Sequence, residues 1–371
     1  MKKLNLLNNT VKPVLILDKI TSDEVEYCIP KSIKYDVIST RNCFNLLIQL
    51  LFLPYFFYYY YYSRNFLLSN TLTICRLKKT KVVLTFTDNN SLPGQIKKFL
   101  PSIMVISIQN GLRSINKFHN WHNISFDILY GFGNYEQGLI KKLNLKINEY
   151  NAVGSLRYGI FKENNQTENK YFKNRIVYIS TWRMNFSTER KEIDEINKNL
   201  NSFLPDVNNF CVNYNKKFSI ITASQSNSKN LKLEIEFFNK KNKNNNFLSR
   251  SSKSESYTFC ENSEIIISHD STLAFEMYGA GKKVLFLGSI NNITEKQNWG
   301  DIFAELPDLV KIVNYDKETL FNKFNILNNI SYEKYLLATQ NSRNFYMNNS
   351  NLHVHQIIKK RVSKFLEQIN F

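Results

Sequence analysis

One stretch of the sequence constrains the fold more than any other, and it spans residues 264–288. Residues 265–267 form an unbroken β-branched run that is too short for a helix, so we predict a strand buried on both faces of a parallel sheet. Polar residues then break the run and cap a helix that begins near Thr272 and stops at Gly279. A second buried strand follows at 284–287. The stretch therefore predicts a strand, helix, strand unit with a right-handed crossover.

The first corner of this unit is the best candidate for chemistry. A strand's carboxyl end meets a helix amino end there, and such corners bind phosphate through free backbone N–H groups. Ser271 and Thr272 can add hydroxyl donors, and Glu276 lies one helical turn further on the same face. A carboxylate at that position could accept both hydroxyls of a ribose. The alternative is that Ser271 and Thr272 only cap the helix and that Glu276 is solvated.

The same residues carry a family resemblance. Residues 268–276, Ser-His-Asp-Ser-Thr-Leu-Ala-Phe-Glu, with 281–286, Gly-Lys-Lys-Val-Leu-Phe, resemble the donor-side motif of the bacterial surface carbohydrate biosynthesis proteins. Looser relatives are the capsule Kdo transferases and the CDP-glycerol glycerophosphotransferases. The resemblance implies an α/β chain with the GT-B fold, in which two Rossmann-like domains have parallel sheets facing a central cleft. It also implies that Ser271 and Thr272 hold the donor phosphates and Glu276 the ribose.

Two strands in the first half of the chain also end in polar residues, where open α/β sheets place their sites. One strand is predicted at 81–87 and the next at 104–108, with a helix around 92–100 between them. We interpret the polar residues as a cleft and acceptor site, although an ordinary Asn-Gly turn explains the second group equally well. The candidates are Asp88, Asn89, Gln109, Asn110, Gly111 and Arg113.

These segments extend the resemblance over most of the chain. Residues 87–89, 108–111, 126–127, 132–133 and 154–155 follow the family's order, whereas the first seventy residues match weakly. We predict an acceptor-side domain over 1–165 and a nucleotide-sugar-binding domain over 166–345. The segment 346–371 is expected to be a helix that packs back on the first domain, as is common in GT-B folds.

Glycosyl transfer in a metal-independent cleft needs groups that take charge off the leaving phosphate and a base near the acceptor oxygen. Arg183, after a predicted strand at 176–180, is a further candidate for the donor phosphate, although a surface Trp-Arg stack is equally consistent with it. Asp88 is the candidate acid/base or nucleophile, with His269 behind it. No metal and no cofactor are expected: His119 and His122 lack a third ligand, and no Gly-x-Gly-x-x-Gly fingerprint exists.

The composition bears on partners and compartment. A formal net charge of +18 points to an anionic partner. Five widely spaced cysteines without a Cys-x-x-Cys fit reduced thiols in the cytoplasm. The apolar run at 44–62 is interpreted as an internal helix broken at Pro54, with an aromatic flank for a membrane surface or a lipid-linked acceptor. We therefore expect a cytoplasmic protein, with peripheral contact to the inner membrane face as an open alternative.

These inferences converge on one function and leave three alternatives. The expected activity is a glycosyltransferase that moves a sugar from a nucleotide-activated donor onto a lipid-linked or oligosaccharide acceptor during surface polysaccharide biosynthesis. A nucleotide-sugar 2-epimerase of the same fold and a CDP-polyol phosphotransferase are the alternative enzymes. A basic nucleic-acid-binding module is the non-enzymatic alternative, and it is disfavoured because no aromatic and basic residues interleave as in RNA-binding motifs. No nucleic acid partner is expected.

Overall fold

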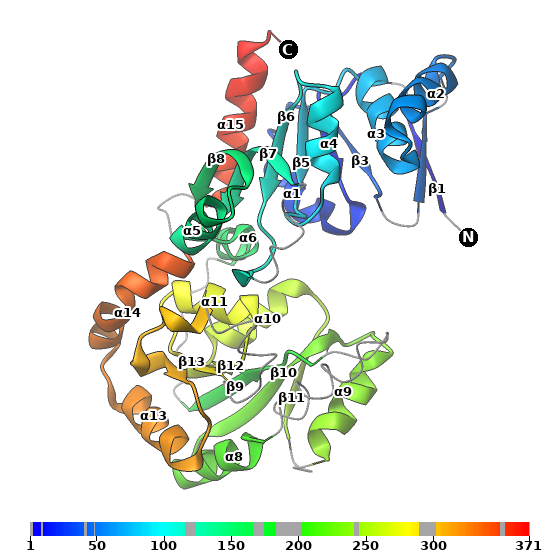
Figure 1. Ribbon diagram of the computed structural model, residues 1–371. Coiled ribbons are helices and arrows are strands. Elements are labelled where there is room, and N and C mark those ends of the chain that lie inside the picture. The colour runs from blue at the N-terminus through cyan, green and yellow to red at the C-terminus, as the bar shows by residue number, and fades with distance from the viewer. Residues whose placement is uncertain are drawn as a thin grey trace. The chain divides into compact units, whose positions relative to one another are not determined.

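The protein is built from two units, each organised around a parallel six-stranded sheet (Figure 1). The first unit comprises residues 1–112, 118–164 and 348–371, and the second comprises 113–117 and 165–347. The computed structural model describes residues 3–8, 10–40, 43–47, 49–115, 124–165, 174–182, 202–240, 245–288, 302–348 and 353–370. The chain's last helix therefore belongs to the first unit, although the second unit separates it in sequence from the rest.

The first sheet has a strand order that reverses direction once. The strands run side by side in the order β3 (Tyr35–Ile38), β2 (Val14–Leu17), β5 (Val82–Thr85), β6 (Met104–Ile108), β7 (Ser125–Gly131) and β8 (Lys146–Ala152). Every pair is parallel, and Leu17 lies beside Ile38 on one side and Thr85 on the other. The order reverses between β2 and β5. Ligands of open α/β sheets bind outside the carboxyl ends of the strands at such a reversal.

Helices cover both faces of this sheet. On one face, α1 (Ser22–Glu26), α6 (Leu156–Asn164) and α15 (Val354–Gln368) contribute to a single apolar core with inward residues of β2, β5, β6 and β7. Val354, Ile358, Val362 and Leu366 are the residues of α15 in that core, at the spacing of one helical face. The unit also contains α3 (Phe66–Leu77), α4 (Leu92–Phe99) and α5 (Asn134–Lys142).

A small second sheet and an aromatic helix extend the first unit. Strands β1 (Lys3–Leu7) and β4 (Cys43–Leu47) pair in parallel, and α2 (Phe52–Ser63) packs on α3. Asn70 of α3 donates a hydrogen bond of 2.6 Å to the carbonyl oxygen of Asn45 in β4. This side-chain contact attaches the small sheet to α3.

The second sheet has the Rossmann strand order. Its strands run in the order β11 (Phe247–Arg250), β10 (Lys217–Gln225), β9 (Arg175–Ile179), β12 (Ile265–Ser268), β13 (Val284–Leu287) and β14 (Lys311–Ile312). All neighbours are parallel, and Ile266 of β12 lies between Val177 of β9 and Val284 of β13. The strand order reverses between β9 and β12. The second unit therefore places its ligand edge at the ends of these two strands.

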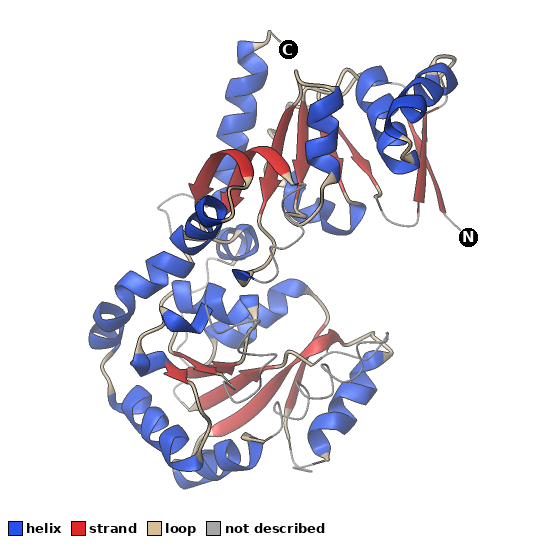
Figure 2. Ribbon diagram, in the orientation of Figure 1, coloured by secondary structure: helices blue, strands red, loops and turns tan. Residues whose placement is uncertain are grey.

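Helices flank the second sheet on both sides, as Figure 2 shows. They are α8 (Leu204–Asn213), α9 (Asn230–Asn239), α10 (Lys253–Glu261), α11 (Thr272–Gly279), α13 (Lys317–Asn329) and α14 (Tyr332–Tyr346). The hydroxyl of fully buried Tyr335 donates to the Lys282 carbonyl oxygen at 2.7 Å and accepts from the Val284 N–H at 3.2 Å. Tyr335 thus ties α14 to the start of β13.

The strand, helix, strand unit predicted at 264–288 is present as β12, α11 and β13. The helix stops for a backbone reason: Gly281 adopts φ +86°, and the Lys282 N–H closes the end by donating to the Met277 carbonyl oxygen at 3.0 Å. The strands predicted in both halves and the helix near 92–100 are confirmed to within two residues at each end.

The interpretation of the apolar run at 44–62 as one helix broken at Pro54 is wrong. The run begins in β4, and α2 starts only at Phe52. Pro54 then lies in the first turn of α2, where a missing backbone N–H costs no helical hydrogen bond. The apolar composition hid the change from strand to helix, because a short apolar run is compatible with either element. Among the described residues no helix is both long and apolar enough to cross a bilayer.

A buried carboxylate links the loops at the carboxyl edge of the second sheet. Glu234 of α9 has no exposed surface. Its Oε1 accepts hydrogen bonds from the Ser180 hydroxyl at 2.5 Å and the Ala223 N–H at 2.8 Å, and its Oε2 accepts from the Ser224 N–H at 2.9 Å. One side chain thereby joins α9 to the ends of β9 and β10. The loops beside the sheet reversal depend on it.

We expect Glu234→Ala to destabilise the protein by about 3 kcal/mol, because three buried donors lose their acceptor. In a unit of this size that corresponds to a Tm lower by roughly 6–12 °C. Differential scanning calorimetry measures the change. The matched control is Glu236→Ala on the same helix, whose side chain is 55% exposed and only 4.0 Å from Lys232. Equal Tm values for the two variants would contradict the linking role of Glu234.

Candidate functional site

The corner between β12 and α11 has the geometry of an anion site. Ser271 is the N-cap of α11 in extended conformation (φ −69°, ψ 128°), and its side chain makes no capping hydrogen bond. Its backbone N–H donates to the Ser268 hydroxyl at 3.3 Å. Ser271 and Thr272 are both partly exposed at this corner. This helix start, with its two partly exposed hydroxyl residues, lies at the reversal of the second sheet, where helix amino ends of such folds can bind anions.

Glu276 lies one turn after Thr272 and is held in place by a neighbouring helix. Its Oε2 accepts a hydrogen bond of 2.7 Å from the hydroxyl of Tyr257 in α10, and only 5% of the residue is exposed. The alternative of a solvated Glu276 is therefore wrong. A carboxylate positioned in this way loses little freedom when it accepts further hydrogen bonds from a ligand.

His269 is enclosed by aromatic rings. Its Nδ1 lies 2.8 Å from the Leu287 carbonyl oxygen, and the rings of Tyr178 and Phe203 pack edge-on against it at 6.1 and 5.6 Å between centroids. Burial lowers the pKa of His269, opposed by Asp270 and by the Leu287 carbonyl. A neutral ring that donates from Nδ1 to a carbonyl leaves Nε2 as an acceptor, and this buried nitrogen has no partner in the described part of the chain.

The carboxyl edge of the first sheet also combines acidic and amide groups. Asp88 follows β5 and is fully buried, while the next residue, Asn89, is exposed. Asp18 follows β2 on the other side of the sheet reversal and adopts φ 78°, a left-handed conformation that costs energy for a residue other than glycine. Two aspartates therefore follow the two strands between which the strand order reverses.

Gln109 connects the ends of β6 and β7. Its Oε1 accepts from the Phe132 N–H at 3.0 Å, and its Nε2 donates to the Gly111 carbonyl oxygen at 2.9 Å and to Glu136 Oε1 at 2.7 Å. Asn110 donates from its side chain to the Phe86 carbonyl oxygen at 2.8 Å. The amide of Gln109 is thus used to shape this edge.

Glu136 of α5 is the residue that the sequence analysis missed at this edge. It is 2% exposed, and its Oε2 has no hydrogen-bond partner among the described residues. Burial raises the pKa of Glu136 to about 8, opposed by hydrogen bonds including that of Gln109 and reinforced by the charge of Asp88. Near pH 7 the protonated form of Glu136 therefore predominates. The only sequence signal was an acidic residue in the first turn after Phe132-Gly133, which is also an ordinary helix start.

Other candidate residues are divided between the units or lie outside the described part. Contacts group Arg113 with the second unit, whereas Gln109, Asn110 and Gly111 belong to the first. Arg183, His119 and His122 lie outside the described residues. Within the described ranges, no group of three or more His, Cys, Asp and Glu side chains could hold a metal ion. Cys28, Cys75, Cys211 and Cys260 are buried free thiols.

The raised pKa of Glu136 gives the protein a pH-dependent stability. The unfolded chain releases this proton near the ordinary value of 4.5, and the folded protein near pH 8. Stability should therefore fall by about 1.4 kcal/mol per pH unit as the pH rises through this window. Glu136→Gln keeps the neutral form at all pH values, so its Tm should exceed that of the wild type at pH 8 and approach it near pH 5. Glu333→Gln, at an exposed position of the second unit, is the control; the same pH profile for wild type and Glu136→Gln would exclude a buried protonated Glu136.

Comparison with protein families gives one match that covers most of the chain. Residues 106–362 match a family described as "putative O-antigen biosynthesis protein". The matched region includes the β6 edge with Gln109, Glu136, and the β12 and α11 corner. No curated protein matches the chain.

Solved structures share the fold across nearly the whole length. UDP-GlcNAc 2-epimerase from Methanocaldococcus jannaschii, in complex with UDP-GlcNAc and UDP, is 16% identical with a TM-score of 0.54 and covers 97% of this chain and 99% of its own. S. aureus MnaA, solved as a co-structure with UDP, is 14% identical with a TM-score of 0.57 and covers 100% and 98%. The wall teichoic acid polymerase TagF is 11% identical with a TM-score of 0.57 and covers 98% and 91%.

The similarity to solved structures agrees with the two parallel sheets. The solved structures identify the architecture as the two-Rossmann-domain GT-B fold. The family match spans more than half of the 371 residues and includes parts of both units. The chain therefore belongs to a family of O-antigen biosynthesis proteins with the GT-B fold.

Proposed function

We propose that this protein is a glycosyltransferase that moves a sugar from a nucleotide-activated donor onto a surface polysaccharide acceptor. The observation that carries the proposal is the corner of β12 and α11, where Ser271, Thr272 and Glu276 combine an anion-binding helix start with a fixed carboxylate. Membership in an O-antigen biosynthesis family supports a polysaccharide product. The acceptor would be lipid-linked or an oligosaccharide, and the protein would meet it at the inner membrane face.

In this proposal the donor's diphosphate binds at the start of α11. First-turn N–H groups and the hydroxyls of Ser271 and Thr272 would take up the negative charge that grows on the leaving phosphate. Glu276, oriented by Tyr257, would accept from the ribose hydroxyls. Arg183 is proposed as an additional cation for the phosphates. Bound metal is not required, because these groups supply the charge stabilisation.

The transfer step in this proposal needs a base for the acceptor hydroxyl. The acceptor oxygen gives its proton to the base and forms a bond to the anomeric carbon, while the bond from that carbon to the phosphate oxygen breaks and the nucleotide leaves. We assign the base to Asp88, which follows β5 beside the reversal of the first sheet, because the neighbouring Glu136 stays protonated near pH 7 and cannot take up the acceptor's proton. Asp88 is fully buried, so the loop at 87–90 must move for an acceptor to reach it.

A nucleotide-sugar 2-epimerase is the second candidate. The structural similarity to UDP-GlcNAc 2-epimerases covers nearly the whole chain, and two acidic side chains, Asp88 and Glu136, interact at the edge of the first sheet. Such an enzyme would act on the free nucleotide sugar and would need no acceptor. The CDP-polyol phosphotransferase alternative has the similarity to TagF in its favour, since one TagF structure was obtained after a soak with CDPG.

Nucleotide binding tests the corner directly. We expect one of CMP, CDP, UDP, GDP and ADP to raise the Tm. At a nucleotide concentration a hundred times the Kd, the free energy of unfolding should increase by about 2.7 kcal/mol. Glu276→Gln preserves a hydrogen-bond acceptor for the Tyr257 hydroxyl but removes the carboxylate. The Kd of that nucleotide, measured by calorimetric titration, should rise roughly tenfold. Glu333→Gln is again the exposed control. An unchanged Kd in Glu276→Gln would remove Glu276 from the ribose site, and no Tm shift with any nucleotide would contradict the donor site.

Acceptor dependence separates transfer from epimerisation. With the donor class known from the titration, we expect nucleotide release from the matching nucleotide sugar only when a lipid extract of polysaccharide-producing cells is present. Asp88→Asn should reduce this release by roughly a hundredfold or more while retaining nucleotide affinity. Formation of an epimeric nucleotide sugar without any acceptor would instead establish the epimerase, and full activity of Asp88→Asn would exclude Asp88 as the base.

A further inference from the structure

The helix α2 has two aromatic faces, of which only one is used in the core. Phe52, Phe56 and Tyr59, spaced by four and three residues, are buried. Phe56 packs edge-on against Phe66 at the start of α3, with 5.2 Å between ring centroids. Tyr59 packs in the same way against Phe99 at 6.5 Å. These contacts account for the buried face of α2.

The other face and the preceding turn expose large apolar side chains to solvent. The described residues include eighteen exposed large hydrophobic residues, and nine of them lie between Leu50 and Phe66. Leu50 is 94% exposed, and Leu53 and Phe57 are 60% and 63% exposed. Scattered exposed apolar residues are normal on a protein surface, but a contiguous group marks an interaction site. We call these nine residues, with the adjacent pocket described next, the tyrosine surface.

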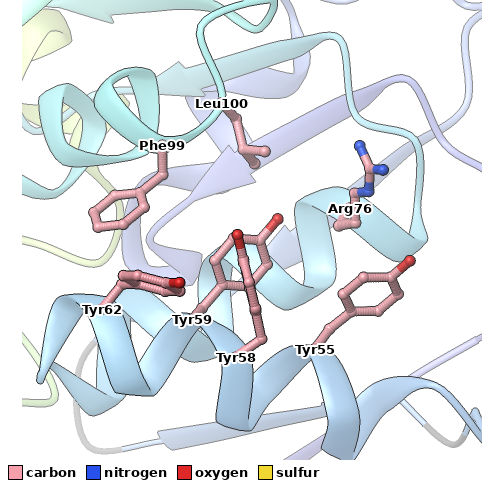
Figure 3. A pocket seen from close by; sticks show the side chains of 7 residues that line it. All are labelled: Tyr55, Tyr58, Tyr59, Tyr62, Arg76, Phe99 and Leu100. Carbon is pink, nitrogen blue, oxygen red and sulfur yellow. The ribbon is translucent and has the colours of Figure 1, made fainter.

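A pocket of about 520 Å³ opens beside this face of α2. Four tyrosines of α2 line it together with Arg76 of α3 and with Phe99 and Leu100 at the end of α4 (Figure 3). In Figure 3 the tyrosine rings rise from α2 on one side of the pocket and Arg76 stands on another. Arg76 is exposed, and no carboxylate pairs with it in the described part of the chain. An exposed guanidinium among phenol hydroxyls suits a phosphate group.

The sequence around α2 contains many more basic than acidic residues. Between Asp36 and Asp127 the sequence has a single acidic residue, Asp88, which is fully buried. The same ninety positions hold ten basic residues, which are Arg41, Arg64, Arg76, Lys78, Lys79, Lys81, Lys97, Lys98, Arg113 and Lys117. Arg64 follows α2 directly, and its guanidinium lies 5.1 Å from the centre of the Tyr61 ring. Lys78 and Lys97 pair with Asp36 and Asp127. Among the described residues of this range in the first unit, the exposed cations are Arg64, Arg76, Lys79 and Lys98.

We propose that the tyrosine surface binds the face of an anionic phospholipid bilayer, with Leu50, Leu53 and Phe57 inserted among the acyl chains and a lipid phosphodiester at Arg76. Tyrosine rings are favoured at the boundary between headgroups and hydrocarbon, because one end of the ring is apolar and the other is wet. An apolar face surrounded by cations is the pattern of interfacial helices. The exposed leucines and phenylalanine favour a bilayer over a soluble sugar, which would stack on rings alone.

This inference deepens the membrane contact in the proposed function, but it rests on neither donor nor acceptor chemistry. Its test therefore needs no substrate. The full chain is sedimented with vesicles of phosphatidylcholine alone and of phosphatidylcholine with phosphatidylglycerol, at low and high salt. We expect binding to the anionic vesicles that weakens with salt, because exposed charges are screened.

Substitutions test whether the tyrosine surface is responsible for vesicle binding. Leu53→Ser with Phe57→Ser should lower the partition coefficient for anionic vesicles by at least about tenfold, because burial of these side chains is lost. Arg76→Gln should lower it by roughly fivefold. The matched control is Val212→Ser with Leu337→Ser, two positions of the second unit that are 79% and 76% exposed; it should bind as the wild type does. Unchanged Tm values would show that each variant folds.

Three results would overturn the proposal. The first is wild-type protein that stays in the supernatant with both kinds of vesicle. The second is equal binding by the wild type and by Leu53→Ser with Phe57→Ser. The third is a dimer in sedimentation equilibrium that the same substitutions dissociate, which would assign the surface to a second copy of the chain. The nucleotide Tm shift, measured on the same samples, distinguishes failure of this inference from failure of the donor site.

Discussion

The site depends on one constraint, which is that a carboxyl group without access to water must be hydrogen-bonded or protonated. The two units meet this constraint differently. Glu234 accepts three hydrogen bonds and holds the loops at the ends of β9 and β10. Glu136 accepts one from Gln109 and is kept protonated by its surroundings. In both units the buried acid shapes the carboxyl edge of a parallel sheet, where ligands of this fold class bind.

The same edges determine which chemistry each unit can supply. The second unit offers a helix start and a carboxylate oriented by Tyr257, a combination suited to a nucleotide. The first unit offers Asp88 beside a neutral acid, a combination suited to proton transfer. The tyrosine surface belongs to the first unit, which is also the unit proposed to receive the acceptor. A lipid-linked acceptor and a membrane-binding surface would then be properties of one domain.

Sequence patterns predicted the elements well wherever apolar runs were bounded by strong stop signals. The unit at 264–288 was predictable because its strands are β-branched, its helix begins at hydroxyl residues and Gly281 permits a left-handed stop. The run at 44–62 was not, because a strand and a helix of similar apolar content follow each other without a glycine between them. Strand β8 was missed because it lies at the edge of its sheet and its residues are mostly polar.

The sequence by itself determined the fold class, the strand ends that carry polar residues and the family resemblance, since each depends on residues that are near one another in the chain. Only the tertiary structure decided which buried groups meet. Glu136 is twenty-seven residues from Gln109, and Glu234 is fifty-four residues from Ser180. No local pattern distinguishes these glutamates from exposed ones such as Glu236, because burial, hydrogen bonding and pKa arise when distant segments pack around a side chain.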